Sequence, residues 1–429
     1  MHSNIWQPFT ILKGAQSPVR VREGDGIWLT LEDGHRIVDC ISSWWVNLHG
    51  HSHPRIVEAI RAQAEKLEHV IFANFSHEPA EKLAERLTGH LPPRLERVFF
   101  SDNGSTAVEV ALKVAWQYWK NRGEPRKRFI AFEGAYHGDT VGAMSIGSRS
   151  VFTQVFDDLM FEVEYIPYPE TWIGDDSAEE REQEVIRLLE KKLEENPDRY
   201  AGVVIEPLVQ GAGGMRVCRE SFLQKLERSC RRNGHLLIFD EVMTGFGRTG
   251  DWFASVRSRV EPDIIALSKG ITGGFLPLAV TVCSEDIYEE FYTRDPLGTL
   301  WHGHSYTANP LGCAAGLASL DLMEENEVMF RGMEQIHREE MESLLQLPYI
   351  EKGRVKGTIS AFSIRQEGQE DGYLNSVADR IKEKCVSYDL LLRPLGNTVY
   401  LMPPYVIREE ELRMVYTKMK ALLQEIVVD

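Results

Sequence analysis

The chain has 429 residues and a formal net charge of −17 at pH 7, with 43% hydrophobic and 26% charged residues. The length allows two or three domains, and the composition is that of an ordinary globular protein. The excess of acidic residues argues against nucleic acid or an anionic membrane as a partner.

Six cysteines are scattered along the chain, and none forms a C-x-x-C pair. This pattern is typical of reduced thiols, so we expect a cytoplasmic protein. The N-terminal residues MHSNIWQPFT lack a basic segment followed by an apolar run, and no stretch of about 18 apolar residues occurs. We therefore expect neither a signal peptide nor a membrane span.

The N-terminal segment, residues 1–55, has the pattern of turns and short strands. Three runs alternate in strand fashion, with glycines as turn points: Val19–Val21, Ile27–Leu31 and Arg36–Asp39. Two adjacent tryptophans, Trp44 and Trp45, follow. Such side chains either pack in a core or form an aromatic wall for a partly apolar substrate, and the sequence leaves both open.

Three histidines at alternate positions, His49, His51 and His53, raise the question of a metal site. On one strand face, three imidazoles could bind a transition metal. No fourth ligand with suitable spacing follows, and a proline ends the run. We therefore expect a tight turn before a helix over Pro54–His69, and no metal.

A strand that runs into a helix marks a candidate phosphate site. Arg97–Phe100 has the pattern of a strand, and a long helix follows it. Gly104 and Ser105 lie at the turn between them, where free amides and a hydroxyl can hold a phosphate at the helix N-terminus. Simple N-capping by Ser105 or Thr106 is the alternative.

Two further strands end in polar side chains. The strand Phe129–Phe132 leads to Tyr136 and His137. The strand Tyr200–Glu206 ends in a carboxylate. A tyrosine at such an edge can stack on a planar ring or pack in the core. Residues 175–200 are highly charged and indicate a solvated amphipathic helix, to which we assign no function.

Two short apolar runs, Leu236–Phe239 and Ile264–Leu267, organise the centre of the chain. Each has the pattern of a buried strand, and the interval between them suffices for a crossover, so we expect parallel strands. The first run leads into Asp240, and the second is followed closely by Lys269. Ligands bind at the carboxyl ends of such strands. An Asp at a ring nitrogen and a Lys that can form an imine are the groups that pyridoxal phosphate chemistry needs.

Together with GFGRTG after Asp240 and GITGG after Lys269, these residues resemble the signature of the class III aminotransferases, a fold-type I family that depends on pyridoxal 5'-phosphate. The resemblance covers nearly the whole chain. It implies an α/β fold with a mostly parallel seven-stranded sheet between helices and a smaller α+β domain. The small domain is expected from residues 1–55 and 325–429, and the large cofactor-binding domain from residues 56–324.

The resemblance also implies roles for the side chains at the sheet edge. The matching Lys269 binds the cofactor covalently and acts as base and acid, and the matching Asp240 pairs with the pyridinium. Tyr136 and Val242 would cover the two faces of the ring. The other implied cofactor-binding residues are Gly104, Ser105, His137, Glu206, His304 and Ser305.

The segment Trp301–Leu311 resembles a family loop that crosses a dimer interface and contacts the phosphate of the neighbour's cofactor. By position, that role falls to Gly303, His304 and Ser305. Thr307 is a competitor, and an ordinary interface or N-cap loop is the alternative. The resemblance therefore implies a homodimer with shared active sites.

Beyond residue 325 the pattern changes to alternating helices and strands. We expect a helix over Glu327–Leu345, a strand over Lys356–Ile364 and a helix over Leu374–Tyr388. Arg393 then lies between apolar runs, where a guanidinium suits either a carboxylate ligand or a structural salt bridge. It matches the family's arginine for the substrate carboxylate.

One subgroup of the family fits best, the enzymes that convert 8-amino-7-oxononanoate to 7,8-diaminononanoate in biotin biosynthesis. The narrower similarity rests on WQPFT at residues 6–10, SSWW at 42–45, YHGDT at 136–140 and RPLG at 393–396. The tryptophans would wall an apolar tunnel for the long substrate chain, and the arginine would take its carboxylate. The implied substrate-binding residues are Phe9, Trp44, Trp45, Tyr136, Gly303 and Arg393.

The resemblance implies a ping-pong transamination with S-adenosylmethionine or L-lysine as the amino donor. Members that use S-adenosylmethionine commonly have Tyr at the position of Phe9, so the donor stays open. One alternative is a class III aminotransferase that uses an ω-amino acid or diamine with pyruvate or 2-oxoglutarate, and another is a glutamate-semialdehyde aminomutase. Intact Lys269 and Asp240 argue against a catalytically silent binding protein of this fold.

Overall fold

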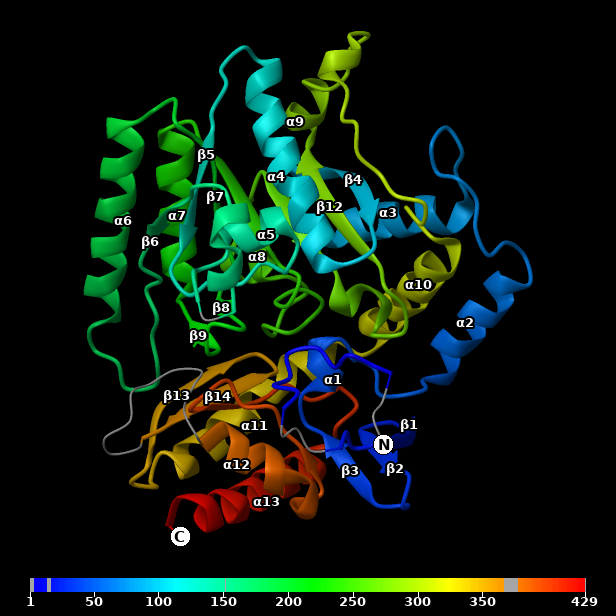
Figure 1. The fold of residues 1–429 in the computed structure, drawn as a ribbon, viewed down its shortest axis with the longest axis vertical. Helices are drawn as coiled ribbons and strands as arrows, with labels where there is room; N and C mark the ends of the chain where they lie inside the picture. Colours follow the sequence, from blue (N-terminus) through cyan, green and yellow to red (C-terminus); the bar gives the residue numbers. More distant parts are fainter. Residues whose placement is uncertain (1–3, 14–16, 151, 366–376, 429) are drawn as a thin grey trace.

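The computed structural model describes residues 4–13, 17–150, 152–365 and 377–428. In Figure 1 a large sheet with its helices forms the upper part, and two smaller sheets with their helices form the lower part. Segments from both ends of the chain lie side by side in the lower part. Among the described residues, no helix combines the length and apolar character needed to cross a membrane.

The large sheet contains seven strands: Leu95–Ser101 (β4), Arg128–Phe132 (β5), Glu164–Ile166 (β6), Tyr200–Ile205 (β7), Leu236–Asp240 (β10), Ile264–Leu267 (β11) and Ala279–Ser284 (β12). Their order across the sheet is β4-β12-β11-β10-β7-β5-β6. The pairs from β11 to β6 are parallel, whereas β12 is antiparallel to both of its neighbours. Asp240 pairs with Ala266, so the two central runs are parallel neighbours as predicted.

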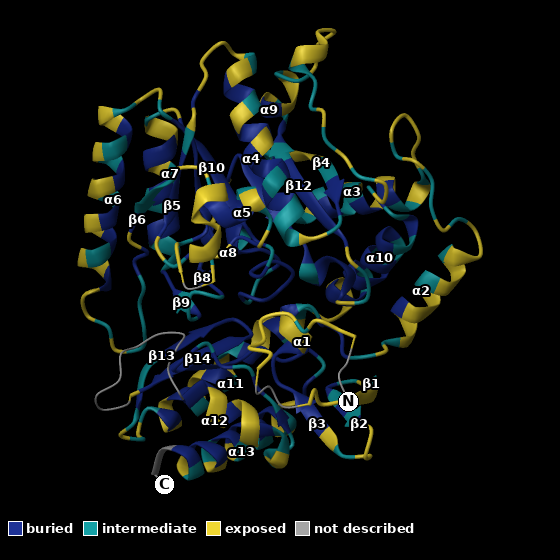
Figure 2. Ribbon diagram, in the orientation of Figure 1, coloured by how far each residue is buried: buried dark blue, intermediate teal, exposed yellow. Residues whose placement is uncertain are grey.

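Helices cover both faces of this sheet, because its central strands are apolar on both sides. Leu236 and Ile238 pack on one face with the helix Gly104–Asn121 (α4), and Leu237 and Phe239 belong to the core on the other face. Figure 2 shows these strands as the buried centre of the upper part. The other helices there are Pro54–Ala64 (α2), Glu78–His90 (α3), Val141–Ile146 (α5), Ala178–Glu195 (α6), Glu220–Arg232 (α7), Ala254–Ser258 (α8), Glu285–Glu289 (α9) and Pro310–Glu325 (α10).

The lower part joins the N-terminal and C-terminal segments. Its four-stranded sheet, β1-β2-β3-β15, consists of Val21–Asp25, Trp28–Leu31, Arg36–Asp39 and Leu390–Leu391. Its three-stranded sheet, β13-β14-β16, consists of Ile350–Lys356, Ile359–Ile364 and Thr398–Leu401. The helices are Glu327–Leu344 (α11), Val377–Lys384 (α12) and Glu409–Val428 (α13). This pairing agrees with the expected small domain, although the domain boundaries stay a prediction.

Three predicted elements differ in the structure. The strand expected over Lys356–Ile364 is a hairpin of β13 and β14 that turns at Gly357, where φ is +60°. The sequence did not predict the turn, because it lies within a run that has the pattern of one strand. It did not predict β13, because Glu, Lys and Gly interrupt the apolar pattern of that strand. The helix expected over Pro54–His69 ends at Ala64. The helix expected over Leu374–Tyr388 begins outside the described residues, and a 3₁₀ turn at Cys385–Tyr388 (η4) ends it.

The short helix Ser42–Trp45 (α1) is left-handed. Its four residues have φ values of +50°, +47°, +78° and +75°. The N–H of Trp45 donates to the carbonyl of Ile41, and the N–H of Val46 donates to the carbonyl of Ser42, both at 2.9 Å. A left-handed turn costs about 1–2 kcal/mol per residue for L-amino acids, so contacts elsewhere must maintain it. It lies at the junction of the two parts (Figure 1).

Candidate functional site

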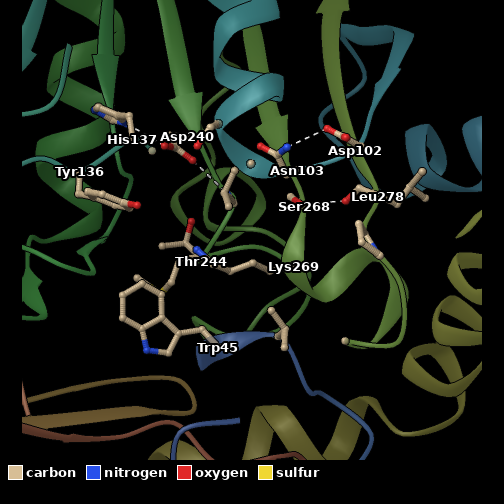
Figure 3. A pocket seen from close by; sticks show the side chains of 18 of the residues that line it. Trp45, Asp102, Asn103, Tyr136, His137, Asp240, Thr244, Ser268, Lys269 and Leu278 are labelled. Atoms are coloured by element: carbon tan, nitrogen blue, oxygen red, sulfur yellow. Dashed lines mark hydrogen bonds and ion pairs between the residues drawn. The ribbon is translucent and has the colours of Figure 1, made fainter. Parts of the chain in front are cut away.

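Asp240 and Lys269 line one cavity at the carboxyl ends of β10 and β11, as Figure 3 shows. The cavity has a volume of about 440 Å³. The sequence therefore correctly predicted that these two groups share a sheet edge. Other predicted site residues that line the same cavity are Trp45, Gly104, Ser105, Tyr136, His137, Glu206 and Val242.

The buried carboxylate of Asp240 is held from two sides. Its Oδ2 lies 2.7 Å from Nδ1 of His137, and its Oδ1 accepts a hydrogen bond from the N–H of Val242 at 3.0 Å. Burial disfavours the imidazolium, but the hydrogen bond to Asp240 and the nearby carboxylates outweigh burial and raise the pKa of His137. His137 Nε2 is buried and has no hydrogen-bond partner among the described residues. The contact that His137 makes in this site is therefore to Asp240.

Lys269 opens a short 3₁₀ helix, Lys269–Thr272 (η2), directly after β11. Its backbone φ is +46°, and its Nζ lies 4.9 Å from the centroid of the Trp45 ring. Burial lowers the pKa of the Lys269 ammonium, although the charges of Asp240 and Glu206 oppose this effect. A lower pKa favours the neutral amine, which is the form that acts as nucleophile and base.

Glu206 fixes the backbone around the cavity. Its Oε1 accepts a hydrogen bond from the N–H of Tyr136 at 3.0 Å, and its Oε2 accepts one from the N–H of Gly211 at 2.9 Å. Burial raises the pKa of Glu206 to about 7, and the nearby His137 acts in the opposite direction. The position of Tyr136 therefore depends on this carboxylate.

The N-terminus of α4 points its first turn at the cavity. Asn103 is the N-cap, because its side chain accepts a hydrogen bond from the N–H of Thr106 at 3.0 Å while Thr106 Oγ1 accepts one from the N–H of Asn103. Capping by Ser105 is thus wrong, and Thr106 takes part only as the partner of Asn103. Ser105 lines the cavity, and its Oγ accepts from the N–H of Asp139 at 3.1 Å.

Val242 and Tyr136 contribute to the walls of the cavity. Val242 lies against Gly104, where a Cβ would stand 2.6 Å from Cγ1 of the valine. Only glycine allows this approach without a shift. Tyr136 is partly exposed, and its hydroxyl donates to Oδ2 of Asp139 at 2.9 Å. Their coverage of two ring faces stays a prediction.

A second cavity of about 840 Å³ adjoins the first and shares Trp45, Tyr136 and Lys269 with it. Phe9 and Trp44 line this larger cavity, with ring centroids 5.5 Å apart in an edge-to-face contact. The guanidinium of Arg393 lies 4.5 Å above the Trp44 ring. Three predicted substrate-binding residues therefore meet, although they come from distant parts of the chain.

The two tryptophans have different surroundings, one in the core and the other at a cavity wall. Trp45 is 4% exposed, and its Nε1 donates to the hydroxyl of Tyr400 at 3.0 Å. Trp44 is 38% exposed and faces Phe9 and Arg393. Trp45 is thus a core residue that also borders both cavities, and Trp44 forms part of the wall of the larger cavity, while a contact of either ring with a substrate stays a prediction.

The loop that carries Gly303, His304 and Ser305 lies apart from these cavities. As far as the structure describes the chain, none of the three residues lines either cavity. Thr307 Oγ1 accepts from the N–H of His304 at 3.1 Å and donates to the carbonyl of the same residue at 2.9 Å. The predicted contact of this loop with a neighbour's cofactor stays a prediction.

Of the three histidines after the tryptophans, His49 and His51 have different hydrogen-bond partners, and the ring centroids of His49 and His53 lie 6.3 Å apart. His49 Nε2 lies 3.0 Å from Ser319 Oγ, and His51 Nε2 lies 2.9 Å from Asp39 Oδ2. No group of three or more His, Cys, Asp or Glu side chains suited to a metal occurs in the part of the chain that the structure describes.

Sequence reasoning missed Arg248, which lies in the GFGRTG segment. Its buried guanidinium donates to the carbonyls of Pro403 at 3.0 Å, Asn47 at 3.2 Å and Trp45 at 3.4 Å. It therefore connects the loop after Asp240 to the turn that carries the tryptophans. The motif itself was visible, but its long-range carbonyl partners were not.

Comparisons with known proteins agree with this geometry. The family described as aminotransferase class-III matches residues 12–423. The adenosylmethionine-8-amino-7-oxononanoate aminotransferase of Synechococcus elongatus is 55% identical over 99% of each chain. The protein of the same name from Geobacter sulfurreducens is 41% identical over 95% of this chain and 93% of its own length.

Solved structures give the same picture. The adenosylmethionine-8-amino-7-oxononanoate aminotransferase of Methanocaldococcus jannaschii aligns with a TM-score of 0.92 at 31% identity, over 99% of this chain and 97% of that one. An amine transaminase from an uncultivated Pseudomonas species, in its PLP-bound form, aligns with a TM-score of 0.93 at 30% identity, over 99% of both chains.

Proposed function

Because this chain belongs to the class-III aminotransferase family, we propose that it transfers an amino group to 8-amino-7-oxononanoate and forms 7,8-diaminononanoate, a step of biotin biosynthesis. The observation that carries the proposal is the meeting of Phe9, Trp44 and Arg393 beside the cavity of Lys269. Aromatic walls suit the aliphatic body of the acceptor, and the guanidinium suits its terminal carboxylate. Relatives named for this acceptor cover the chain at 55% and 41% identity.

The cofactor is pyridoxal 5'-phosphate, as the family and the PLP-bound structural relative indicate. The smaller cavity fits this group. Asp240 offers a buried carboxylate for a protonated ring nitrogen, and Lys269 offers a partly buried amine for the aldehyde. Ser105 and the first amides of α4 suit the phosphate. A Cβ on Gly138 would collide with Ser105 Oγ, so the absence of a side chain there keeps this cradle open.

The mechanism follows from the positions of the side chains. When bound, pyridoxal phosphate supplies a conjugated ring that accepts electrons from a carbon that loses its proton. Lys269 Nζ removes the proton from the amine-bearing carbon of the donor and later delivers a proton to the ketone carbon of the acceptor. Asp240 holds a proton at the ring nitrogen, and His137 holds Asp240 in place. Glu206 positions Tyr136 beside the reacting groups.

The substrate chain extends from Lys269 into the larger cavity in this proposal. Trp45 borders both cavities and so lines the passage between them. Phe9 and Trp44 contact the aliphatic part of the acceptor, and Arg393 binds the carboxylate at its end. The amino donor occupies the same space in the other half-reaction, since a ping-pong enzyme binds its two substrates in turn.

We also infer a homodimer with shared active sites in the cytoplasm. The dimer is supported by the loop with Gly303, His304 and Ser305, which resembles a family loop that serves the neighbouring subunit. Among the described residues, none of these three lines either cavity of its own chain. The cytoplasmic location is supported by six free cysteines and by small-molecule substrates of a biosynthetic reaction.

We expect the cofactor-loaded protein to form 7,8-diaminononanoate from 8-amino-7-oxononanoate when the correct donor is present, as measured by mass spectrometry. S-adenosylmethionine and lysine are added separately, and loss of the visible absorbance of the bound cofactor identifies the donor. If the absorbance falls with S-adenosylmethionine alone, the replacement of the usual Tyr by Phe9 has no effect on the choice of donor. If it falls with lysine alone, Phe9 is a candidate determinant of the donor. Turnover of ω-amino acids or diamines without this product would favour a general ω-aminotransferase instead.

The role of Arg393 can be tested with a substitution that keeps an unbranched side-chain stem but removes the charged guanidinium. In Arg393→Met, we expect the KM for 8-amino-7-oxononanoate to rise about 10- to 100-fold, because a charge-assisted hydrogen bond contributes about 1.5–3 kcal/mol. Steady-state kinetics with the acceptor varied measure this effect. The methyl ester of the acceptor is the matched control and should distinguish little between wild type and variant. An unchanged KM for the free acid would contradict the assignment.

A further inference from the structure

The left-handed turn α1 contains four successive residues in a conformation that L side chains rarely adopt. None of the four is a glycine. Such a turn persists only when its surroundings determine it. Both tryptophans of the turn border the cavities of the site. The residues that hold the turn in this conformation can therefore affect the reaction.

Asp39, at the end of β3, makes the most contacts with the start of the turn. Its Oδ1 accepts hydrogen bonds from the N–H of Ile41 at 3.2 Å and of Ser43 at 2.9 Å. Its Oδ2 accepts one from Ser43 Oγ at 2.7 Å and lies 2.9 Å from His51 Nε2. The carboxylate is fully buried, and four donors therefore converge on it. His51 is itself held by Asn47, whose Nδ2 lies 3.0 Å from the other ring nitrogen.

Hydrogen bonds from other described residues hold the two ends of the turn rather than its middle. Ser42 Oγ donates to the carbonyl of Met402 at 2.7 Å, and Arg248 donates to the carbonyl of Trp45. Asp39 binds both the backbone and the side chain of Ser43, directly before Trp44. Asp39 itself lines neither cavity among the described residues, so any effect on the reaction passes through the turn.

We propose that Asp39 is a positioning residue for the transamination: it holds Ser42–Trp45 in the left-handed form and thereby places Trp44 and Trp45 against the chain of the acceptor. The identity of the acceptor in this inference rests on the proposed function. The consequence is that KM for the acceptor and the occupancy of the cofactor respond differently. Loss of Asp39 weakens binding of the acceptor, while the cofactor stays bound, because Lys269, Asp240 and Ser105, which are assigned to hold it, lie on elements other than the turn.

Asp39→Asn tests the proposal, because the amide keeps one acceptor oxygen but presents N–H groups to Ser43 and His51. We expect the KM for 8-amino-7-oxononanoate to rise about fivefold or more, the range that one or two lost hydrogen bonds produce, with kcat within about twofold of wild type. Bound cofactor, measured by absorbance, should be unchanged. A general structural defect would instead lower kcat, cofactor content and melting temperature together, and that result would overturn the proposal.

Asp389→Asn is the matched control. Asp389 also binds a histidine beside the four-stranded sheet, since its Oδ1 lies 2.6 Å from His35 Nε2, and it pairs with Lys418. It lines neither cavity in the described part of the chain. We expect wild-type KM in this variant. Equal KM values for the two Asp→Asn variants would also overturn the proposal.

A second pair of variants tests the handedness of the turn with Asp39 itself unchanged. Both variants lose the same hydrogen bond from Ser43 Oγ to Asp39, so the comparison between them isolates the backbone conformation. Ser43→Ala and Ser43→Gly both remove the hydroxyl, but only alanine keeps a Cβ at φ +47°. We expect the glycine variant to have the higher melting temperature and the lower KM for the acceptor, because glycine adopts positive φ without strain. In a right-handed helix the order of stability would be reversed, and that order would exclude the left-handed turn.

These measurements separate the inference from the proposed function. If the wild-type protein does not aminate 8-amino-7-oxononanoate, the proposed function fails, and the melting temperatures of the two Ser43 variants still test the turn. If the wild-type protein turns over this acceptor but Asp39→Asn has an unchanged KM, the proposed function stands and the role of Asp39 is wrong.

Discussion

Loss of the Lys269 amine is expected to abolish transamination. In Lys269→Ala we expect activity to fall by about 10⁴-fold or more, because the variant loses the group to which we assign both the covalent binding of the cofactor and the proton transfer. Lys269 Nζ lies 4.9 Å from the centroid of the Trp45 ring, and no other lysine lines the smaller cavity in the described structure. Single-turnover assays with excess enzyme, together with thermal melting, measure activity and folding separately.

The matched control is Lys352→Ala. Lys352 lines the larger cavity but not the cavity that contains Asp240. This variant also loses an ammonium group near the substrate, so it reports the effect of charge alone. We expect it to keep activity within about tenfold of wild type, the scale of a lost surface-accessible charge. Wild-type turnover by Lys269→Ala would refute the proposed mechanism.

The second large effect is expected for Asp240→Asn. The amide has the shape of the carboxylate but no negative charge, so it cannot hold the proton on the ring nitrogen. We expect kcat/KM to fall about 10²- to 10³-fold, equivalent to about 3–4 kcal/mol of transition-state stabilisation, which is typical of a lost electrostatic contact in a buried site. The hydrogen bond to His137 weakens at the same time. Steady-state kinetics and the absorbance of the bound cofactor measure the two consequences.

Asp139→Asn is the control for this prediction. Asp139 lines the larger cavity and accepts a hydrogen bond from Tyr136, so its loss also removes a carboxylate near the site. In the described structure its hydrogen bonds join Tyr136 and Ser105 rather than Asp240, and we expect a loss of less than about tenfold, as for one ordinary hydrogen bond. A larger loss for Asp139→Asn than for Asp240→Asn would reverse the assigned roles.

The centre of the fold was predictable because its signals are local. β10 and β11 are short apolar runs with a polar residue at or just after each end, and rules of sheet topology place those ends at one edge. Tyr136 and Glu206 were predictable for the same reason, since each follows or ends a strand of the same sheet. Their roles came from the resemblance to the family rather than from the strand pattern.

The features that the sequence did not reveal depend on contacts between distant segments. The positive φ values of Ser42–Trp45 arise in residues that ordinarily avoid them, and the partners that stabilise the turn include Met402 and Arg248. The carbonyl contacts of Arg248 likewise join distant segments, since its partners lie 155, 201 and 203 residues away in the sequence. No local pattern encodes such contacts.

The division of the tryptophan pair could not be foreseen either. In a right-handed helix or a strand, neighbouring positions would have distinct and familiar directions. Here the turn buries Trp45 against Tyr400 and leaves Trp44 partly exposed beside Arg393. The sequence left open whether these tryptophans pack in the core or line a cavity, and only the three-dimensional structure shows which of them does which.

The left-handed turn also constrains how the substrate range of this enzyme can change. Trp44 has a φ of +78°, so a replacement that widens the larger cavity must also tolerate that backbone conformation. Glycine and asparagine meet both conditions, whereas valine and isoleucine remove bulk but add a β-branch where the backbone disfavours it. Only a few residue types at this position can therefore make room for bulkier acceptors, whether they arise by evolution or by engineering. The handedness of one short turn thus limits which new substrates are reachable by a single substitution.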